Sequence, residues 1–391
     1  MTSFASNDDG AGLAAPQRAA LASFHAVIPA GGVGTRLWPL SRAGAPKFLH
    51  DLTGSGSTLL RATYDRLEPL AHDRMMVVTG VAHKEAVCGQ LPEIPDSELV
   101  LESEPKDSAA AIGLAAAILF ERDPSIIMGS FAADHVISPD GVFQAAVREA
   151  ILTAAPGEGS DGKIVTIGIA PTHASTGFGY IRTGDPLAVA GAPHAYAVAE
   201  FVEKPDQQTA DRYLAEGGYS WNAGMFVAPV SLMLKHLAAN EPELHAGLTE
   251  IAQAWDTPQR AEVTGRIWPN LPKIAIDYAV AEPAAAAGDV AVIPGEFRWD
   301  DVGDFAAIGR LNSAKDTDNV TVLGEGARRV FTEDASGVVV TDTKRVIALI
   351  GIDDVVIVDT PDALLVTTTA HAQRVKAAVE SLKASGDVDV L

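Results

Sequence analysis

Cysteine and positive charge are scarce in this sequence. Its 391 residues include one cysteine, Cys88, so no disulfide can form within the chain and no cluster of cysteine thiolates can bind zinc. There are 29 lysines and arginines against 51 aspartates and glutamates, which gives a formal net charge of −22 at pH 7. A surface this acidic repels nucleic acid and anionic membranes, so we expect neither as a partner. A phosphate ligand would need a locally basic pocket or a metal ion.

Long apolar runs are also absent. No run approaches the roughly 20 residues that span a bilayer, and residues 1–23 lack the cationic stretch and apolar block of a secretory signal. We therefore expect a cytoplasmic protein. Residues 1–23 are rich in alanine, serine, glycine and aspartate, and they predict a flexible tail with a short helix around residues 17–21. Hydrophobic residues make up 47% of the chain and charged residues 20%, which predicts a globular protein.

Apolar segments of strand length alternate with segments of helical periodicity. The sequence predicts strands at residues 24–30, 74–79, 125–131 and 163–169, and helices at residues 58–70, 108–120 and 142–154. This alternation predicts an α/β fold with a mostly parallel, Rossmann-like sheet that has helices on both faces. Ligands of such sheets bind beyond the carboxyl ends of the strands.

The pattern changes after about residue 312. Short β-rich segments, separated by glycine and aspartate, lead to one final helix. The predicted strands are residues 320–323, 338–341, 346–350, 355–358 and 363–366, and the predicted helix is 371–383. We therefore predict a large domain at residues 24–311 and a small β-rich domain at residues 312–391. Because no clean repeat period is present, stacked β-helix-like coils and a compact sheet both remain open.

A glycine-rich turn follows the first predicted strand. Residues 30–37 read AGGVGTRL, and the glycines at Gly31, Gly32 and Gly34 would let the backbone approach a ligand closely, with N–H groups free to face a phosphate or a base. The Gly-Lys-Ser/Thr ending of a P-loop is missing. A dinucleotide fingerprint would need glycine where the chain has Leu37, which argues against a Rossmann dehydrogenase. Taken alone, the segment also fits an ordinary glycine turn.

A lysine lies eleven residues beyond Arg36, in the sequence APKFL at residues 45–49. A lysine on a stretch that leaves the same loop can bring a point charge to phosphate oxygens. Arg36 and Lys47 together would offset the charge of a triphosphate, which this acidic protein otherwise repels. A solvated surface lysine is the alternative for Lys47 taken singly.

These motifs resemble the signature of the sugar nucleotidylyltransferases. Residues 31–42, GGVGTRLWPLSR, carry the resemblance together with Pro46 and Lys47, and the WPLS extension resembles the branch that acts on mannose 1-phosphate. Further motifs follow in the family's order: ADHVI at 133–137, TGFGYI at 176–181, FVEKP at 201–205, WNAGMF at 221–226, IDYA at 276–279 and WDDVG at 299–303. The resemblance covers roughly residues 24–311, and the β-rich segment resembles the short C-terminal domain of the same enzymes.

The resemblance implies a reaction and a set of roles. GTP and α-D-mannose 1-phosphate would be the substrates, GDP-mannose and pyrophosphate the products, and Mg²⁺ the cofactor. Arg36 and Lys47 would be catalytic. The nucleotide would contact Ala30, Gly31, Gly32, Gly34, Thr35, Glu104, Ser108 and Asp134. The sugar phosphate would contact Gly179, Glu203, Lys204, Asn222 and Asp277.

Two carboxylates are the expected metal ligands. Asp134 follows a predicted buried strand, and Asp301 lies far away in the sequence but could meet it across the site. Two hard carboxylates plus phosphate oxygens suit Mg²⁺, which keeps several waters. We favour Asp301 over Asp300 because the family's motif varies at the first of the two positions. The alternatives are a turn cap for Asp134 and a surface acidic pair for Asp300 and Asp301.

The sugar-binding candidates have simpler explanations too. In an extended segment Glu203 and Lys204 would project to opposite sides, the acid toward sugar hydroxyls and the lysine toward the sugar phosphate; a strand-end ion pair is the alternative. Asn222 offers both a donor and an acceptor but also fits a turn. Asp277 suits a helix N-cap equally well, and Gly179 also fits an ordinary loop glycine.

One segment departs from the family pattern. Guanylyltransferases carry an Arg-Asn-Thr-Ala-Pro-like stretch after Glu-Pro, whereas residues 104–111 read EPKDSAAA. Because this segment lies near the nucleotide in the family, another pair such as dTTP and glucose 1-phosphate stays open. A non-catalytic sensor of nucleotide sugars is a second alternative, against which the full set of candidate cations and acids argues. The resemblance also makes the β-rich segment a candidate surface for a homodimer.

Overall fold

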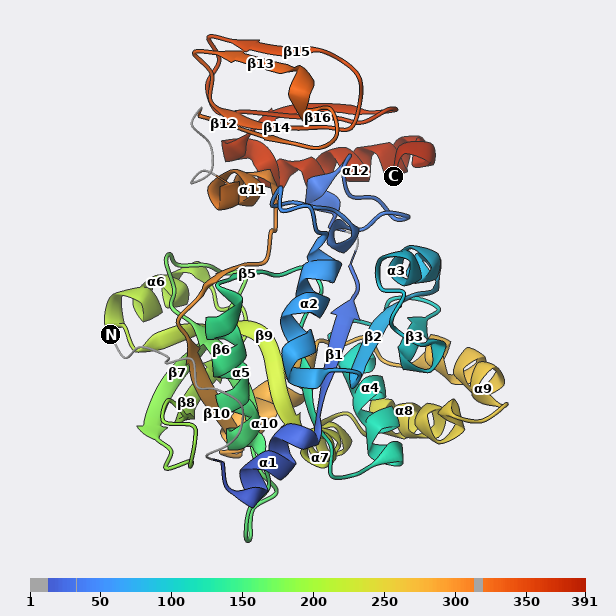
Figure 1. Ribbon diagram of the computed structural model, residues 1–391, viewed down its shortest axis with the longest axis vertical. Coiled ribbons are helices and arrows are strands. Elements are labelled where there is room, and N and C mark those ends of the chain that lie inside the picture. Colours follow the sequence, from blue (N-terminus) through green and yellow to red (C-terminus); the bar gives the residue numbers. More distant parts are fainter. Residues whose placement is uncertain (1–12, 33, 313–318) are drawn as a thin grey trace.

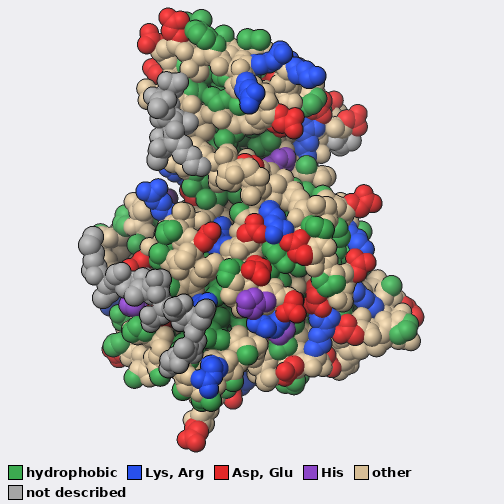
Figure 2. Space-filling model, viewed as in Figure 1, with side chains coloured by type: hydrophobic (Ala, Val, Ile, Leu, Met, Phe, Trp, Pro, Cys, Tyr) green, Lys and Arg blue, Asp and Glu red, His purple; other side chains and the backbone are tan. Residues whose placement is uncertain are grey.

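Two domains of unequal size make up the molecule. The computed structural model describes residues 13–32, 34–312 and 319–391 (Figure 1). A large α/β domain carries a small β-rich domain at one end, and helices α11 (Phe305–Asn312) and α12 (Val375–Ser385) lie between the two. Acidic side chains are spread over both domains on the face shown in Figure 2. No helix in the described part of the chain is long and apolar enough to cross a membrane.

A twisted central sheet organises the large domain. In the described part of the chain its strand order is β3 (Leu99–Glu102), β2 (Met75–Gly80), β1 (Phe24–Ala30), β4 (Ile127–Ser130), β9 (Tyr219–Pro229), β6 (Ile164–Ile169), β10 (Val290–Gly295), β8 (Tyr196–Val202) and β7 (Gly179–Pro186). Strands β8 and β9 run against the other seven. The predicted α/β class is therefore confirmed. Most strands share one direction, but the pairing around β8 and β9 is antiparallel.

Strand β1 shows why the sheet needs helices on both faces. Phe24, Ala26 and Ile28 belong to one buried cluster, whereas Val27 belongs to the other. Successive side chains of a strand point to opposite faces, so a uniformly apolar strand must be covered twice. The first face is covered by α1 (Ala15–Ala22), α2 (Leu59–Ala71), α3 (Lys84–Gln90), α5 (Asp140–Ala154) and α6 (Gln207–Glu216). The second is covered by α4 (Ser108–Arg122), α7 (Val230–Asn240), α8 (Pro242–Trp255), α9 (Arg260–Ile267) and α10 (Glu282–Ala286).

The predicted N-terminal tail extends too far. The short helix expected near residues 17–21 is α1, which packs against α5 and buries Ala20. Gln17 also donates a hydrogen bond from Nε2 to the Ala190 carbonyl, at 2.8 Å. Residues 15–22 are therefore part of the folded large domain, and residues 1–12 of the predicted tail lie outside the described residues.

The small domain is built from stacked coils. Strands β12 (Val320–Leu323), β14 (Gly337–Thr341) and β16 (Val355–Asp359) pair in parallel, β17 (Leu364–Thr368) closes this sheet antiparallel, and β13 (Val330–Glu333) pairs in parallel with β15 (Ile347–Ile350). The coil alternative is therefore the correct one. Residue 320 pairs with 337 and 337 with 355, so successive coils take 17 and then 18 residues. This unequal spacing explains why no clean repeat period is visible in the sequence.

The interface between the domains has its own apolar core. Leu37 and Leu40, which follow the glycine loop, pack in one buried cluster with Phe305 of α11 and with Val338 and Val356 of the coils. Helix α11 therefore belongs to the interface by its packing, and the predicted boundary at residues 311 and 312 falls inside this helix. Helix α12 begins at Val375, after a 3₁₀ segment at Thr369–Arg374 that occupies the start of the predicted final helix.

Candidate active site

The glycine loop leaves β1 at the carboxyl edge of the sheet. Ala30 ends the strand and is fully buried, whereas Gly31 and Gly32 are exposed, and a Cβ at either would meet nothing within 4 Å. Gly34 has a φ of +70°, and a Cβ there would lie 3.1 Å from the Lys47 Cβ. Glycine is therefore required at position 34 both by the backbone and by the close approach of Lys47. Thr35 follows in the short 3₁₀ segment Thr35–Leu37 that carries Arg36.

Lys47 connects two segments that are far apart in the sequence. Its Nζ forms an ion pair with Asp134 Oδ2 at 2.9 Å and donates a hydrogen bond to the backbone carbonyl of Asp301 at 2.6 Å. The Lys47 side chain is 13% exposed. The surface-lysine alternative is therefore wrong, because this ammonium group is held between the two turns that carry the candidate acids.

The two candidate acids lie close enough to affect each other. Burial disfavours the charge of Asp134, but Lys47 and His135 outweigh it and hold the pKa of this carboxyl below its usual value. Burial raises the pKa of Asp301 against the opposing charge of Lys47, and the charges of Asp300 and Asp134 raise it further. The site therefore combines two acids with one shared lysine.

Asp300 and Asp301 have different surroundings. Asp300 Oδ1 accepts a hydrogen bond from the Val302 N–H at 2.7 Å, and Asp300 Oδ2 lies 3.7 Å from Arg310 Nη2. Val302 is buried at a φ of +46°, a conformation that β-branched residues rarely adopt, so Asp300 supports a strained turn. Asp301 contacts Lys47 through its backbone carbonyl rather than through its carboxylate, and Asp301 lines the cleft described below, so the preference for Asp301 over Asp300 stays a prediction.

A cleft of about 1250 Å³ joins these groups. Arg36, Lys204 and Asp301 all line it, and Lys47 and Asp134 adjoin Asp301 through the contacts described above. Arg36 makes no ion pair or hydrogen bond within the described parts of the chain, so its guanidinium remains available to a ligand. Three of the candidates, Arg36, Lys204 and Asp301, therefore line one cleft, and Lys47 and Asp134 lie beside it.

The backbone at Lys204 differs from the expectation. The φ of Lys204 is +46°, so the chain turns there, and Lys204 Nζ pairs with Glu203 Oε1 at 2.8 Å. The prediction that the two side chains project to opposite sides is therefore wrong. Glu203 Oε2 is buried without a hydrogen-bond partner, and a Cβ at Gly179 would lie 2.4 Å from it. Gly179 thus leaves the space that this carboxylate occupies. Burial and the nearby charge of Asp277 raise the pKa of Glu203.

Asn222 orients Asp277. The Asn222 Oδ1 accepts hydrogen bonds from Thr166 Oγ1 at 3.0 Å and from the Gly224 N–H at 3.1 Å, and Nδ2 donates to Asp277 Oδ1 at 2.7 Å. Asp277 opens the π-helical segment Asp277–Ala281, whose N-cap is Ile276, so the N-cap alternative for Asp277 is wrong. Burial raises the pKa of Asp277. Single π turns are rare and frequently occur at functional sites.

Glu104 and Ser108 are engaged within the protein. Glu104 Oε1 pairs with Lys106 Nζ at 2.8 Å, and Ser108 Oγ accepts a hydrogen bond from the Ile276 N–H at 2.9 Å. Neither residue lines the cleft. Ser108 therefore ties the start of α4 to the segment before Asp277, and its predicted role in nucleotide binding stays a prediction.

Two features were missed by the sequence analysis. One is an aromatic wall of the cleft, in which the Phe178 ring centroid lies 5.0 Å from that of Trp221 and 5.2 Å from that of Trp299. These residues lie inside the sequence motifs described above, and those motifs were the sequence signal that could have identified the wall.

The second missed feature is Glu102, the last residue of β3, whose side chain has no hydrogen-bond partner among the described residues. Burial raises its pKa to about 7. An acid ending a buried strand was the signal there.

Replacing Glu102 with glutamine is expected to change how stability depends on pH. The folded-state pKa of about 7 lies above the ordinary value of 4.5, so the folded chain binds the proton more tightly than the unfolded chain. Native stability therefore falls as pH rises from about 4.5 to about 7. The glutamine variant lacks this loss. Between pH 4.5 and pH 8 its free energy of unfolding should therefore rise relative to that of the native chain by on the order of 1–3 kcal/mol.

Urea unfolding at the two pH values measures this difference. Glu121→Gln, at an exposed position on α4, is the matched control and should follow the native curve. Parallel pH dependence of all three proteins would contradict the assignment of the raised pKa to Glu102.

The fold and the cleft define a nucleotidyltransferase that carries a β-helix domain. Residues 25–318 match the family described as nucleotidyl transferase. Residues 328–382 match the mannose-phosphate isomerase/GMP-like β-helix domain. Enzymes of the nucleotidyltransferase family generally use a divalent metal ion.

Curated relatives and a solved structure indicate the same branch of the nucleotidyltransferase family. The chain is 37% identical over 369 residues to mannose-1-phosphate guanylyltransferase RfbM of Salmonella typhimurium, covering 92% of this chain and 73% of that protein. It is 36% identical over 361 residues to a mannose-1-phosphate guanylyltransferase of Escherichia coli, covering 91% of this chain and 73% of that protein. A crystal structure from Thermus thermophilus, described as a mannose-1-phosphate geranyltransferase, is 32% identical with a TM-score of 0.78, covering 92% of this chain and 99% of that one. The chain belongs to the mannose-1-phosphate guanylyltransferase family.

Proposed function

We propose that the chain catalyses guanylyl transfer from GTP to α-D-mannose 1-phosphate, producing GDP-mannose and pyrophosphate. The observation that carries the proposal is the convergence of Arg36, Lys204 and Asp301 on one cleft, with Lys47 holding Asp134 beside Asp301. Membership of the family supports the choice of GTP and mannose 1-phosphate.

The reaction is a direct displacement at phosphorus. A phosphate oxygen of mannose 1-phosphate forms a bond to the α-phosphorus of GTP, the bond from this phosphorus to the β-phosphate oxygen breaks, and pyrophosphate leaves with the electron pair. The nucleophile is already an anion, so neither a general base nor a covalent enzyme intermediate is required. The protein contributes positioning and stabilisation of charge.

Each cation has a location that suits its proposed role. Arg36 faces the cleft without an ion pair among the described residues, so its guanidinium can bind triphosphate oxygens. Lys47 is held by Asp134 and by the Asp301 carbonyl, so its ammonium is fixed before the substrates arrive. Lys204 lines the cleft beside Glu203 and can bind the sugar phosphate.

The acids fit a magnesium ion that substrates help to bind. No group of three or more histidines, cysteines, aspartates and glutamates able to hold a metal exists among the described residues. Asp134 and Asp301 supply two hard carboxylates, and Mg²⁺ in proteins commonly completes its shell with water and substrate phosphates. When bound, the ion would offset the repulsion between the two anionic substrates.

The sugar would lie at the end of the cleft formed by Lys204 and the aromatic wall. The buried Glu203 carboxylate and Asp277 are held close by, the latter through Asn222. Carboxylates that accept hydrogen bonds from hydroxyl groups, next to an aromatic surface, are suited to a hexose. The predicted homodimer, the cytoplasmic location and the absence of nucleic-acid and membrane partners stay predictions of the sequence.

A matrix of nucleoside triphosphates against sugar 1-phosphates tests the proposal, with pyrophosphate release as the readout. We expect GTP with mannose 1-phosphate to give the highest kcat/KM, by about 100-fold or more over dTTP with glucose 1-phosphate. Highest turnover with another pair would identify a different nucleotidyltransferase. Binding of GDP-mannose with no pyrophosphate released from any pair would identify a sensor.

A further inference from the structure

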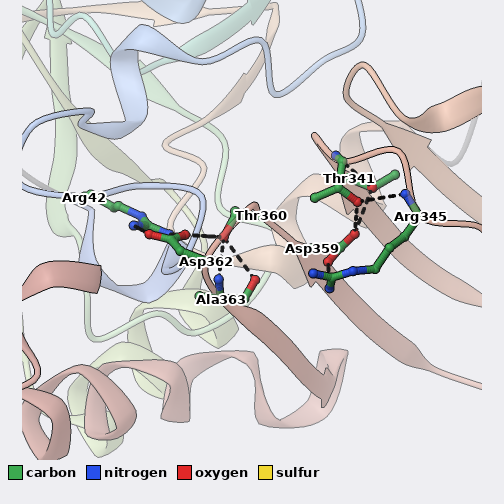
Figure 3. Close-up of polar contacts among 8 residues, drawn as sticks. Arg42, Thr341, Arg345, Asp359, Thr360, Asp362 and Ala363 are labelled. Carbon is green, nitrogen blue, oxygen red and sulfur yellow. Dashed lines mark hydrogen bonds and ion pairs between the residues drawn. The ribbon is translucent and has the colours of Figure 1, made fainter.

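The signature motif reaches the C-terminal domain through Arg42, which lies six residues beyond Arg36. Arg42 donates from Nη1 to Asp362 Oδ2 at 2.6 Å and from Nη2 to Asp362 Oδ1 at 2.5 Å, and Nη2 also donates to Thr360 Oγ1 at 3.1 Å (Figure 3). A bidentate arginine–carboxylate pair fixes direction as well as distance. The pKa of Asp362 is held down at about 2, chiefly by the hydrogen bonds from Arg42.

The anchored arginine is connected to the glycine loop. Ser41, its neighbour, donates a hydrogen bond from Oγ to the Gly34 carbonyl at 3.0 Å, and Gly34 packs against Lys47. Trp38 makes a second tie across the interface, because its Nε1 donates to the Val390 carbonyl at 2.7 Å. The loop that carries Arg36 is therefore held from the side of the C-terminal domain.

The turn that carries Asp301 is held from the same domain. Asp304, three residues further on, accepts a hydrogen bond from the Ala307 N–H through Oδ1 at 2.9 Å and so caps the start of α11. Its other oxygen, Oδ2, accepts a hydrogen bond from Gln373 of the C-terminal domain, and Gln373 and Asp304 both line the cleft. The two halves of the site, which come from the start and the end of the large domain, thus meet the same small domain.

We propose that the β-helix domain positions both catalytic segments, with Asp362 acting on the glycine loop through Arg42 and Gln373 acting on the Asp301 turn through Asp304. Asp362 is a positioning residue, because it acts on the cleft through Arg42, and Gln373 has a positioning role through its hydrogen bond to Asp304, although Gln373 also lines the cleft. The proposal rests on the proposed function, since the positioned groups are those assigned to nucleotidyl transfer. An interface that served only to hold the two domains together would need no contact with the glycine loop or with the Asp301 turn.

Asp362→Ala and Arg345→Ala form the matched pair that tests the proposal. Arg345 Nη1 pairs with Asp359 Oδ1 at 2.6 Å, an ion pair of the same chemistry that lies wholly inside the β-helix domain (Figure 3). We expect Asp362→Ala to lower kcat by about 10- to 100-fold, since small displacements of catalytic groups carry penalties of this size. Arg345→Ala should lower thermal stability but leave kcat within about twofold of the native value.

A double-mutant cycle separates positioning from loss of stability. Arg42→Ala combined with Asp362→Ala should be no slower than the slower single variant, because both changes remove the same contact. Hydrogen exchange of residues 31–49 should rise in Asp362→Ala and not in Arg345→Ala, a readout that does not need turnover.

The failure of the inference differs from the failure of the proposed function. Native kcat and native exchange in Asp362→Ala would overturn the inference while the native enzyme remains active. Absence of turnover in the native protein would instead overturn the proposed function, and the exchange data would still decide whether the domain orders the loop. Equal losses of kcat in Asp362→Ala and Arg345→Ala would also overturn the inference, because general destabilisation would then explain both.

Discussion

Replacing Lys47 with methionine is expected to lower kcat by roughly 100-fold or more, because a fixed positive charge beside the proposed phosphate site is lost. Methionine keeps much of the length of the side chain, so packing against Gly34 is largely preserved. The same change leaves Asp134 without its ion pair, which adds a repulsive charge next to the triphosphate. Steady-state release of pyrophosphate at saturating substrates measures the effect.

Lys163→Met is the matched control for this prediction. Lys163 Nζ donates to the Gly288 carbonyl at 2.7 Å and lies 3.8 Å from Asp289 Oδ1, so it also combines a carbonyl and a carboxylate. Neither of these partners lines the cleft, whereas Asp301, which Lys47 contacts, does. The control should turn over like the native enzyme, and urea unfolding of both variants shows how much of any loss is instability. A Lys47→Met enzyme within threefold of the control would remove Lys47 from the mechanism.

Replacing Asp301 with asparagine is expected to lower kcat by roughly 100- to 1000-fold and to raise the Mg²⁺ concentration needed for half-maximal activity. The substitution keeps the shape of the side chain and the backbone carbonyl that Lys47 contacts, so the loss reports the missing negative charge. Titrating activity with Mg²⁺ at fixed substrate concentrations measures both effects.

The variant Asp300→Asn tests whether Asp301 or Asp300 is the metal ligand. An asparagine Oδ1 can still accept the hydrogen bond from the Val302 N–H, so the strained turn should survive. We expect less than about a fivefold change in kcat, with the Mg²⁺ requirement unaltered. If Asp300→Asn instead had the lower kcat of the two variants, Asp300 would be assigned as the metal ligand.

The helices and strands of the large domain were predictable because their signals are local. Strand β1 and helix α4 follow from apolar periodicity within single segments, and both agree with the structure. The turn at Lys204 was not predictable in this way. A positive φ in a residue other than glycine is imposed by surrounding packing, and it reversed the expected direction of the two side chains. The coils of the β-helix were likewise not predictable, because their unequal lengths leave no constant repeat in the sequence.

The sequence by itself determined the residue types of the site, their order along the chain and the family to which the motifs point. It could not determine which of these residues meet. Lys47 reaches the Asp301 carbonyl across 254 positions, and Arg42 reaches Asp362 across 320. Contacts at such separations depend on how the strands order in the sheet and on how the β-helix domain docks. Both are set by the packing of apolar faces over the whole molecule. A short motif reflects only the local conformation and chemistry of its own residues.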